Sequence, residues 1–226
     1  MAVIRNSGSI SLLLGNGNGT FQSPSSFCSG ASSPTSLVRA DLNGDGVDDL
    51  VVTNGGFSFG SVSVILGNGD GTFQTPRMLT PDRNPSSVAV GDLNGDGVLD
   101  LAVSNRDSAN VTVFLGNGNG TFQPGVDFFV FGSGPAAVVL GDFNGDGRLD
   151  IATANSFSNN VSVLLNNEVL NAVALTLISF VDAGEFGVGS SPRSLVICDF
   201  NGDGQLDLAV ANSQSNDLAV LFNATR

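Results

Sequence analysis

The sequence predicts an all-β fold built by repetition of one unit of about 50 residues. Three observations lead to this prediction. An aspartate-rich segment recurs four times, short runs of branched residues alternate with polar ones, and Asn-Gly pairs recur between these runs. Such alternation is typical of strands, and Asn-Gly pairs are typical of tight hairpin turns. A chain of 226 residues is long enough for one domain of this kind.

Two blocks define the repeat. The aspartate-rich segments read DLNGDGVDD, DLNGDGVLD, DFNGDGRLD and DFNGDGQLD, and they begin at Asp41, Asp92, Asp142 and Asp199. Their first aspartates are 51, 50 and 57 residues apart. The second block reads LGNGNGTFQ or LGNGDGTFQ and begins at Leu14, Leu66 and Leu115. Self-similarity at such a period indicates stacked structural units.

Each period contains enough sequence for four strands. In the second repeat, residues 87–90 alternate before the aspartate-rich loop, residues 99–103 follow it, and residues 110–115 precede a Gly-Asn turn. Four antiparallel strands in one period describe a blade of the β-propeller type. A single blade cannot bury both of its faces, so the blades must stack on one another.

We therefore expect one β-propeller-type domain over residues 1–226, an array of about five blades whose two terminal members are incomplete. The expected boundaries are a partial blade at 1–30, complete blades at about 36–82, 87–130 and 136–183, and a partial blade at 194–226. Two alternatives stay open: the chain is part of a larger ring, or its open edges join neighbouring subunits. The phenylalanines that follow each Gly-Thr pair are expected between blades, and they are Phe21, Phe73 and Phe122.

The composition excludes several functions. The chain has 21 acidic residues against eight basic ones, all arginine, and a formal charge of −13, which disfavours nucleic acid and anionic membranes as partners. There is no histidine, so Ser-His-Asp or Cys-His catalysis and His-ligated zinc are excluded. The absence of Trp and Tyr weakens a sugar-stacking function. We predict that the protein is not an enzyme.

Targeting and redox signals are few. No signal peptide is visible in this chain, and no apolar stretch is long enough to span a bilayer. Cys28 and Cys198 do not make a disulfide framework. We expect both cysteines to be small buried side chains, and a disulfide between them is the alternative.

The aspartate-rich loops predict calcium sites. Their first, third, fifth and ninth residues carry side-chain oxygens, while the seventh varies, which suggests a backbone carbonyl ligand there. Hard oxygen ligands at alternating positions with interior glycines suit Ca²⁺. The predicted ligands are Asp41, Asn43, Asp45, Val47 and Asp49; Asp92, Asn94, Asp96, Val98 and Asp100; Asp142, Asn144, Asp146, Arg148 and Asp150; and Asp199, Asn201, Asp203, Gln205 and Asp207.

Two alternatives for the loops are weaker. An EF-hand needs a glutamate at the twelfth position and flanking helices, whereas the twelfth residue here is Val52, Val103, Thr153 or Val210 and the flanks are strands. Simple Asp-Gly turns do not explain why all four loops keep all three aspartates. We expect about four Ca²⁺ ions per chain, which would add eight positive charges and change the formal charge from −13 to −5.

The loop pattern D-x-N-x-D-G-x-x-D between two strands resembles the FG-GAP (VCBS-type) repeat. That repeat builds the calcium-binding propeller of integrin α chains and of many secreted bacterial proteins. The segments Phe131-Gly132-Ser133-Gly134-Pro135 and Phe186-Gly187-Val188-Gly189 resemble the segment that gives the repeat its name. The resemblance implies a propeller with calcium on blade-edge loops and an extracellular or cell-surface setting.

We therefore expect a secreted, calcium-stabilised structural or adhesive module. Its partners would be another protein or further copies of itself, joined through blade edges and including a filament as one form. The alternative is a lectin-like propeller that binds a glycan or another small ligand.

Overall fold

The computed structural model describes all residues except 1, 6–7, 57–59, 168, 171–175 and 224–226. The described residues form strands, turns and loops, and none of them is helical. The strands are β1 (Ala2–Arg5), β2 (Ser9–Leu12), β3 (Ser25–Cys28), β4 (Pro34–Ala40), β5 (Asp49–Asn54), β6 (Ser61–Ile65), β7 (Arg77–Leu79), β8 (Pro85–Gly91), β9 (Asp100–Asn105), β10 (Asn110–Phe114), β11 (Val126–Phe129), β12 (Pro135–Gly141), β13 (Asp150–Asn155), β14 (Asn160–Asn166), β15 (Val169–Leu170), β16 (Thr176–Leu177), β17 (Phe180–Gly187), β18 (Pro192–Cys198), β19 (Asp207–Asn212) and β20 (Asp217–Leu221). The all-β prediction is confirmed.

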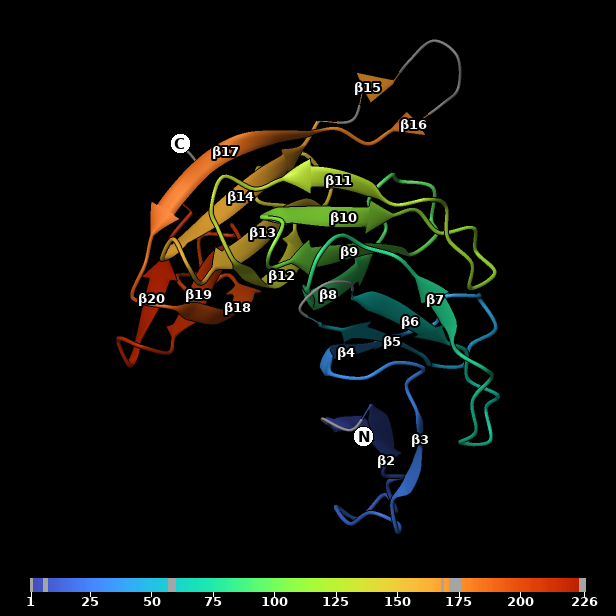
Figure 1. Cartoon of the computed structure of the whole chain (residues 1–226). Coiled ribbons are helices and arrows are strands. Elements are labelled where there is room, and N and C mark those ends of the chain that lie inside the picture. The colour runs from blue at the N-terminus through green and yellow to red at the C-terminus, as the bar shows by residue number, and fades with distance from the viewer. Residues whose placement is uncertain (1, 6–7, 57–59, 168, 171–175, 224–226) are drawn as a thin grey trace.

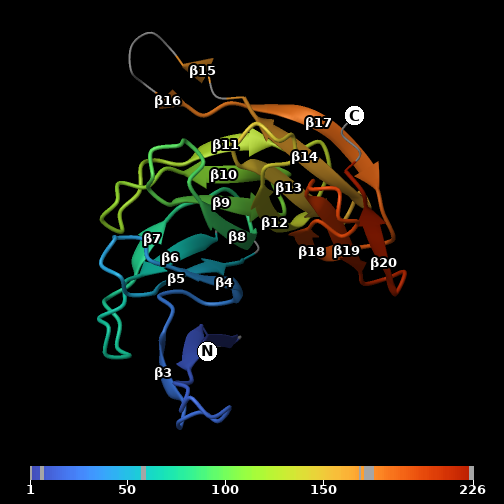
Figure 2. The same ribbon diagram turned by 180° about the vertical axis from the view of Figure 1, so that it is seen from behind.

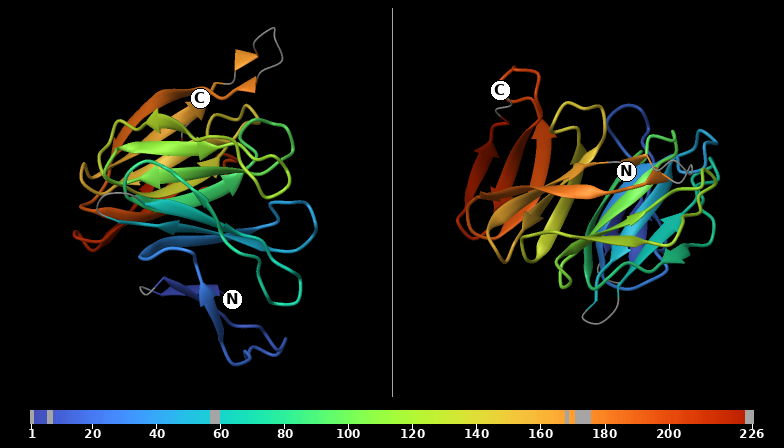
Figure 3. Two further views of the ribbon diagram at one scale, coloured as in Figure 1. Left: turned by 45° about the vertical axis from the view of Figure 1, so that its right-hand side comes forward. Right: turned by 90° about the horizontal axis from the view of Figure 1, so that it is seen from above.

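The strands of the described residues form five antiparallel sheets of three or four strands, together with a two-stranded ribbon, β15-β16. The sheets are β1-β2-β3, β4-β5-β6-β7, β8-β9-β10-β11, β12-β13-β14-β17 and β18-β19-β20. They follow one another along an arc, from the blue N-terminal sheet to the red C-terminal sheet (Figures 1 and 2). The first strands β4, β8, β12 and β18 contact one another in series. From above, the sheets stand side by side in chain order (Figure 3).

The hydrophobic core lies between successive sheets. One cluster joins β1–β3 to β4–β7 through Ile10 and Val52, and the next joins β4–β7 to β8–β11 through Val51 and Val103. Two further clusters continue this pattern toward the C-terminal sheet. Adjacent residues of one strand thus face opposite neighbours, as Val51 and Val52 do. The second strands β5, β9 and β13 are buried along their whole length for this reason.

The first strand of each aspartate-containing sheet begins with a proline and a register shift. The shifts lie at Pro34/Ser36, Pro85/Ser87, Pro135/Ala137 and Pro192/Ser194. Proline has no N–H to give to the ladder, which explains its place at the start of the strand. In the first two of these strands the hydroxyl of the next residue binds the neighbouring sheet: Thr35 Oγ1 donates to the Pro85 carbonyl at 2.9 Å, and Ser86 Oγ to the Pro135 carbonyl at 2.6 Å.

The glycines of the Phe-Gly segments leave room for a buried asparagine. A Cβ on Gly132 would lie 2.1 Å from Asn155 Nδ2, and one on Gly189 would lie 2.8 Å from Asn212 Nδ2. Asn155 and Asn212 end the second strands of their sheets and are 0% and 2% exposed. Close backbone approach, and not a turn, therefore explains glycine at these two positions.

Two expectations are wrong. Cys28 and Cys198 are both exposed and free, because each lies on a strand whose outer face no described sheet covers. Phe21 is 49% exposed and is not a core residue, whereas Phe73 stacks on Phe27 with ring centroids 4.6 Å apart and Phe122 packs against the cluster around Val51. In the described part of the chain, no helix has the length and apolar character needed to cross a membrane.

Candidate metal-binding loops

The four aspartate-rich loops occupy equivalent places in the fold. Each connects the first strand of a sheet to the second, so the ninth residue of the loop is also the first residue of the second strand. The loops are 41–49 between β4 and β5, 92–100 between β8 and β9, 142–150 between β12 and β13, and 199–207 between β18 and β19. The repeated sequence thus forms a repeated local structure at the same end of four sheets.

The first aspartate of each loop binds the backbone of the turn that follows it. In the first loop, Asp41 Oδ1 accepts hydrogen bonds from the N–H groups of Gly44 (2.8 Å) and Asp45 (3.1 Å), and Oδ2 accepts one from Gly46 (2.8 Å). Asp92, Asp142 and Asp199 make the same three bonds. These bonds hold the pKa of Asp41 and the pKa of Asp199 below the ordinary value of an aspartate. The bond from the glycine at the sixth position has the largest effect.

The third and fifth residues are bonded to each other. Asn43 Nδ2 donates to Asp45 Oδ2 at 2.9 Å, the Asp45 N–H donates to Asn43 Oδ1 at 3.1 Å, and the Val47 N–H donates to Asp45 Oδ1 at 2.8 Å. The other three loops repeat this network. Gly44 and Gly46 have φ values of 74° and 80°, and a Cβ on either would meet nothing within 4 Å. Glycine is therefore required here by the left-handed backbone and not by space.

The ninth aspartate is buried and clamps the loop to the third strand. Asp49 Oδ2 accepts the N–H of Leu42, the second loop residue, at 2.9 Å, and Oδ1 accepts the N–H of Gly67, just after β6, at 2.8 Å. Asp100, Asp150 and Asp207 make the corresponding pairs of bonds. All four of these aspartates are 0% exposed. Each clamp fixes the start of the second strand against both of its neighbours.

The electrostatics of the ninth aspartates favour a nearby positive charge. Burial raises the pKa of Asp49, Asp100 and Asp150 above its ordinary value, and the negative charges of the fifth and first aspartates raise it further. A bound cation would act in the opposite direction, because it favours the ionised carboxylate.

The loops bring together part of each predicted ligand set. The first, third and fifth residues share one exposed network, while the ninth lies in a separate buried one. The seventh residue takes part through its backbone N–H. Within the described ranges, no three His, Cys, Asp or Glu side chains are grouped as a metal cluster. The donor type nevertheless fits a hard cation, since carboxylate and amide oxygens at alternating positions are Ca²⁺ ligands and each carboxylate oxygen has a second lone pair.

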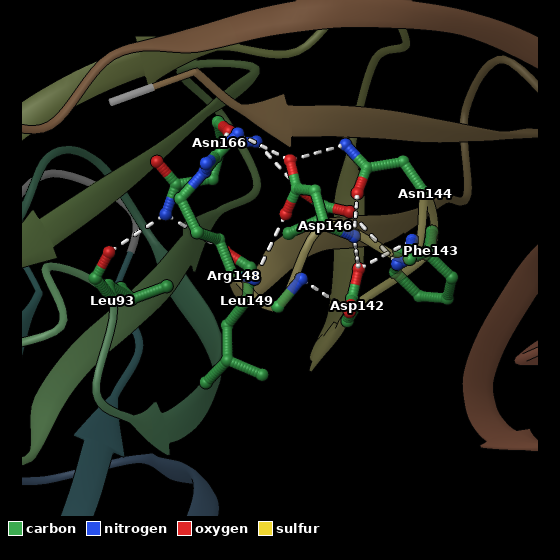
Figure 4. A network of polar contacts seen from close by, with 11 residues as sticks. Leu93, Asp142, Phe143, Asn144, Asp146, Arg148, Leu149 and Asn166 are labelled. Carbon is green, nitrogen blue, oxygen red and sulfur yellow. Dashed lines mark hydrogen bonds and ion pairs between the residues drawn. The ribbon is translucent and has the colours of Figure 1, made fainter. Parts of the chain in front are cut away.

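Sequence reasoning missed the partners of the ninth aspartate. The residues whose N–H groups complete the clamp are Gly67, Gly116, Asn166 and Asn223. The signal was present in the sequence, because Gly67 and Gly116 belong to the second recurring block. Arg148 was predicted only as a backbone ligand, but its guanidinium pairs with Asp146 in the third loop (Figure 4).

Comparisons with known proteins agree with this architecture. A lectin from Agrocybe aegerita, described as recognising non-reducing terminal N-acetylglucosamine, superposes with a TM-score of 0.55 and 20% identity over 96% of this chain and 58% of its own. A protein from Lactobacillus plantarum superposes with a TM-score of 0.51 and 16% identity over 96% and 63%. These similarities concern the fold, and this chain spans less than two thirds of either protein. A comparison with curated proteins gave no match.

The family comparison coincides with the repeats. The model of the FG-GAP-like repeat matches four times, over residues 1–52, 41–103, 92–153 and 142–210. The last three matches each begin at the first aspartate of a loop and end within the second strand that follows the next loop. Together with the four equivalent loops, these matches show that the chain belongs to the FG-GAP-like repeat family.

Proposed function

We propose that this protein is a calcium-stabilised structural or adhesive module that works outside the cell. In this proposal the five sheets are the blades of a β-propeller-type array, and each of the four loops holds one Ca²⁺ ion. The observation that carries the proposal is the fourfold recurrence of one loop, in which the same hydrogen bonds from N–H groups hold carboxylate and amide oxygens at the first, third and fifth residues.

The charge of the molecule supports this role. Twelve of its 21 acidic side chains are the first, fifth and ninth residues of the four loops, and the net charge is −13. Carboxylates gathered in this way repel one another, and a divalent ion would relieve that repulsion. The residues that would hold it are the first, third, fifth and ninth side chains and the seventh carbonyl. The ion would supply structural rigidity and no reaction step.

The expected contribution to stability is large. At free calcium about 100 times the dissociation constant, one site stabilises a protein by roughly 2.7 kcal/mol. Four independent sites would contribute about 11 kcal/mol, comparable with the roughly 5–15 kcal/mol of a whole domain. Sites of modest affinity fill at extracellular calcium levels and not in resting cytosol, which supports an extracellular setting.

Exposed apolar side chains support a binding partner. Leu218 and Val220 in β20 are 74% and 44% exposed, and Phe222, just after this strand, is 59% exposed. An apolar cavity of about 530 Å³ lies between β20 and β17. Apolar surface of this kind marks contacts with another protein or another copy. The glycan-binding alternative has less support, because the walls of this cavity are mostly Phe, Leu and Val.

Native mass spectrometry across a calcium titration, with chelator as the baseline, tests the proposal. We expect four ions per chain, together with a higher melting temperature in calcium. Asp45→Asn, which changes the fifth residue of the first loop, should lose one ion. Asp48→Asn should keep all four, because its side chain pairs with Arg39 outside the network. Absence of calcium uptake by the wild-type protein would refute the calcium role.

A further inference from the structure

The third loop differs from the others in that it carries its own positive charge. Arg148 is its seventh residue, and the Nη2 atom of its guanidinium pairs with Oδ2 of Asp146, the fifth residue (Figure 4). The Arg148 Nε atom donates a second hydrogen bond to the carbonyl of Asn166 at 3.0 Å. One side chain thus joins a predicted calcium ligand to the end of β14.

Two partners hold the guanidinium group of this arginine in place. Its acceptor Asn166 is 1% exposed, and the Asn166 N–H is bound by Asp150 Oδ1 at 2.7 Å. The side chains of Arg148 and Asp146 are themselves only 39% and 26% exposed. Arg148 therefore connects the exposed part of the loop to its buried clamp, and it differs from an arginine that moves freely in solvent.

The other loops have no such charge. The equivalent residues are Val47, Val98 and Gln205, and all three are neutral. The first loop does have an arginine nearby, but Arg39 pairs with Asp48, the eighth residue, whose side chain points away from the network and is 55% exposed. In the part of the chain that the structure describes, Arg148–Asp146 is the one ion pair that uses a predicted ligand.

We propose that Arg148 takes the place of a cation in the third loop, which makes this loop the weak calcium site of the four. The inference rests on the proposed calcium role of the loops. A divalent ion at this site must share or displace the guanidinium on Asp146, and it is repelled by that charge. Interaction of a divalent and a monovalent charge a few ångströms apart in water weakens binding about tenfold.

The same pair gives the third loop a different role when calcium is scarce. In each of the first, second and fourth loops, no positively charged residue of the loop pairs with the carboxylates of the first, fifth and ninth residues. In the third loop, Arg148 neutralises the fifth of these, Asp146. This loop should stay closed at calcium concentrations that empty the other three. The array would then retain one ordered loop, at the junction that Asn166 makes with Leu93.

Calcium loading followed by native mass spectrometry tests the proposal. We expect the wild-type protein to accumulate a three-ion species over about a tenfold range of free calcium before it takes up the fourth ion. Arg148→Gln, which copies the fourth loop, should lose this plateau and load four ions together. Arg39→Gln removes the same charge elsewhere and should keep the plateau. Asp146→Asn should remove the weak ion, and Asp96→Asn a tight one.

A second measurement separates this inference from the calcium role itself. In chelator, Arg148→Gln should lower the melting temperature by about 2–4 °C, the shift expected for the loss of roughly 1 kcal/mol in a domain of this size, while Arg39→Gln should not. Loading of four ions by the wild-type protein without a plateau would overturn the inference and leave the calcium role intact. An Arg148→Gln variant whose ion loading and melting temperature match those of the wild type would do the same. Zero uptake by every variant would overturn both, whatever the result in chelator.

Discussion

The side-chain amide of Asn166 donates a hydrogen bond to the backbone carbonyl of Leu93, 73 residues earlier in the chain, at 2.8 Å. Leu93 is the second residue of the second loop, and Asn166 ends β14 in the next sheet. Asn223 makes the equivalent bond to the carbonyl of Phe143 at 2.7 Å. An asparagine at the end of a third strand, or just after it, therefore ties its sheet to the loop of the preceding sheet at two successive junctions.

Replacing Asn166 with alanine should lower the free energy of unfolding by about 1–2 kcal/mol, because the carbonyls of Leu93 and Leu149 lose their side-chain donor in a buried place. Urea unfolding in chelator measures the effect without a contribution from metal. The matched control is Asn167→Ala at the exposed neighbouring residue, which should leave the stability within about 0.5 kcal/mol of the wild type. Equal stabilities of the two variants would contradict the role of this bond.

The clamp formed by the ninth aspartate leads to a second prediction. Asp100 accepts the N–H of Leu93 with one oxygen and the N–H of Gly116 with the other, at 2.9 and 2.8 Å. Asparagine has only one acceptor oxygen, so Asp100→Asn would place an NH₂ group against an N–H donor. We expect this substitution to lower the free energy of unfolding in chelator by about 2–3 kcal/mol, measured by thermal unfolding. Asp48→Asn, at an exposed aspartate, should change little, and a similar loss in both variants would argue against the clamp.

Titration of the same loops gives a third prediction. Burial raises the pKa of Asp100 above the value of about 3.9 expected in the unfolded chain, so the folded state binds this proton more tightly. The contribution of Asp100 to stability is therefore present below that unfolded value and is lost as the pH rises through the folded pKa. Asp41 behaves in the opposite way, because backbone hydrogen bonds lower its pKa: its contribution is present above the unfolded value and is lost as the pH falls.

Carbon-13 NMR of the carboxyl groups in chelator should therefore show a higher midpoint for Asp100 than for Asp41. Added calcium should lower the midpoint of Asp100, because a nearby cation favours the ionised form. Equal midpoints in chelator would show that the buried clamp does not perturb its carboxylate.

The sequence predicts the loops and the strand order well because both depend on local chemistry. Glycine at positive φ, aspartate beside free backbone N–H groups and branched residues in alternation each determine a short segment by itself. Identical local sequence does not determine packing, however. Phe21 and Phe122 both follow Gly-Asn-Gly-Thr, yet Phe122 packs against the cluster around Val51, while Phe21 is exposed because no described sheet lies beyond β1–β3 to cover it.

The sequence also did not predict hydrogen-bond partners that lie far apart along the chain. The ninth aspartate was predicted as a metal ligand, but nothing in the nine-residue loop indicates that its second oxygen binds the N–H of a residue 16 or 18 positions later. Arg148 looked like evidence that the seventh side chain is unimportant, since that position varies. Its pairing with Asp146 depends on the place of Asn166, which only the packed third strand provides.

A strained residue offers the last prediction. Ala109 has a φ of 52°, a left-handed conformation that is unfavourable for alanine, and the equivalent residues before β14 and β20 are Asn159 and Asn216, with φ values of 58° and 55°. Asparagine tolerates this conformation better, so Ala109→Asn should raise the free energy of unfolding by about 0.5–1 kcal/mol. Ala109→Val should lower it, because a β-branched side chain fits positive φ least well. Urea unfolding of the two variants, side by side, should show shifts of opposite sign. Shifts of the same sign would mean that contacts around the side chain, and not the backbone conformation, decide which residue suits this turn.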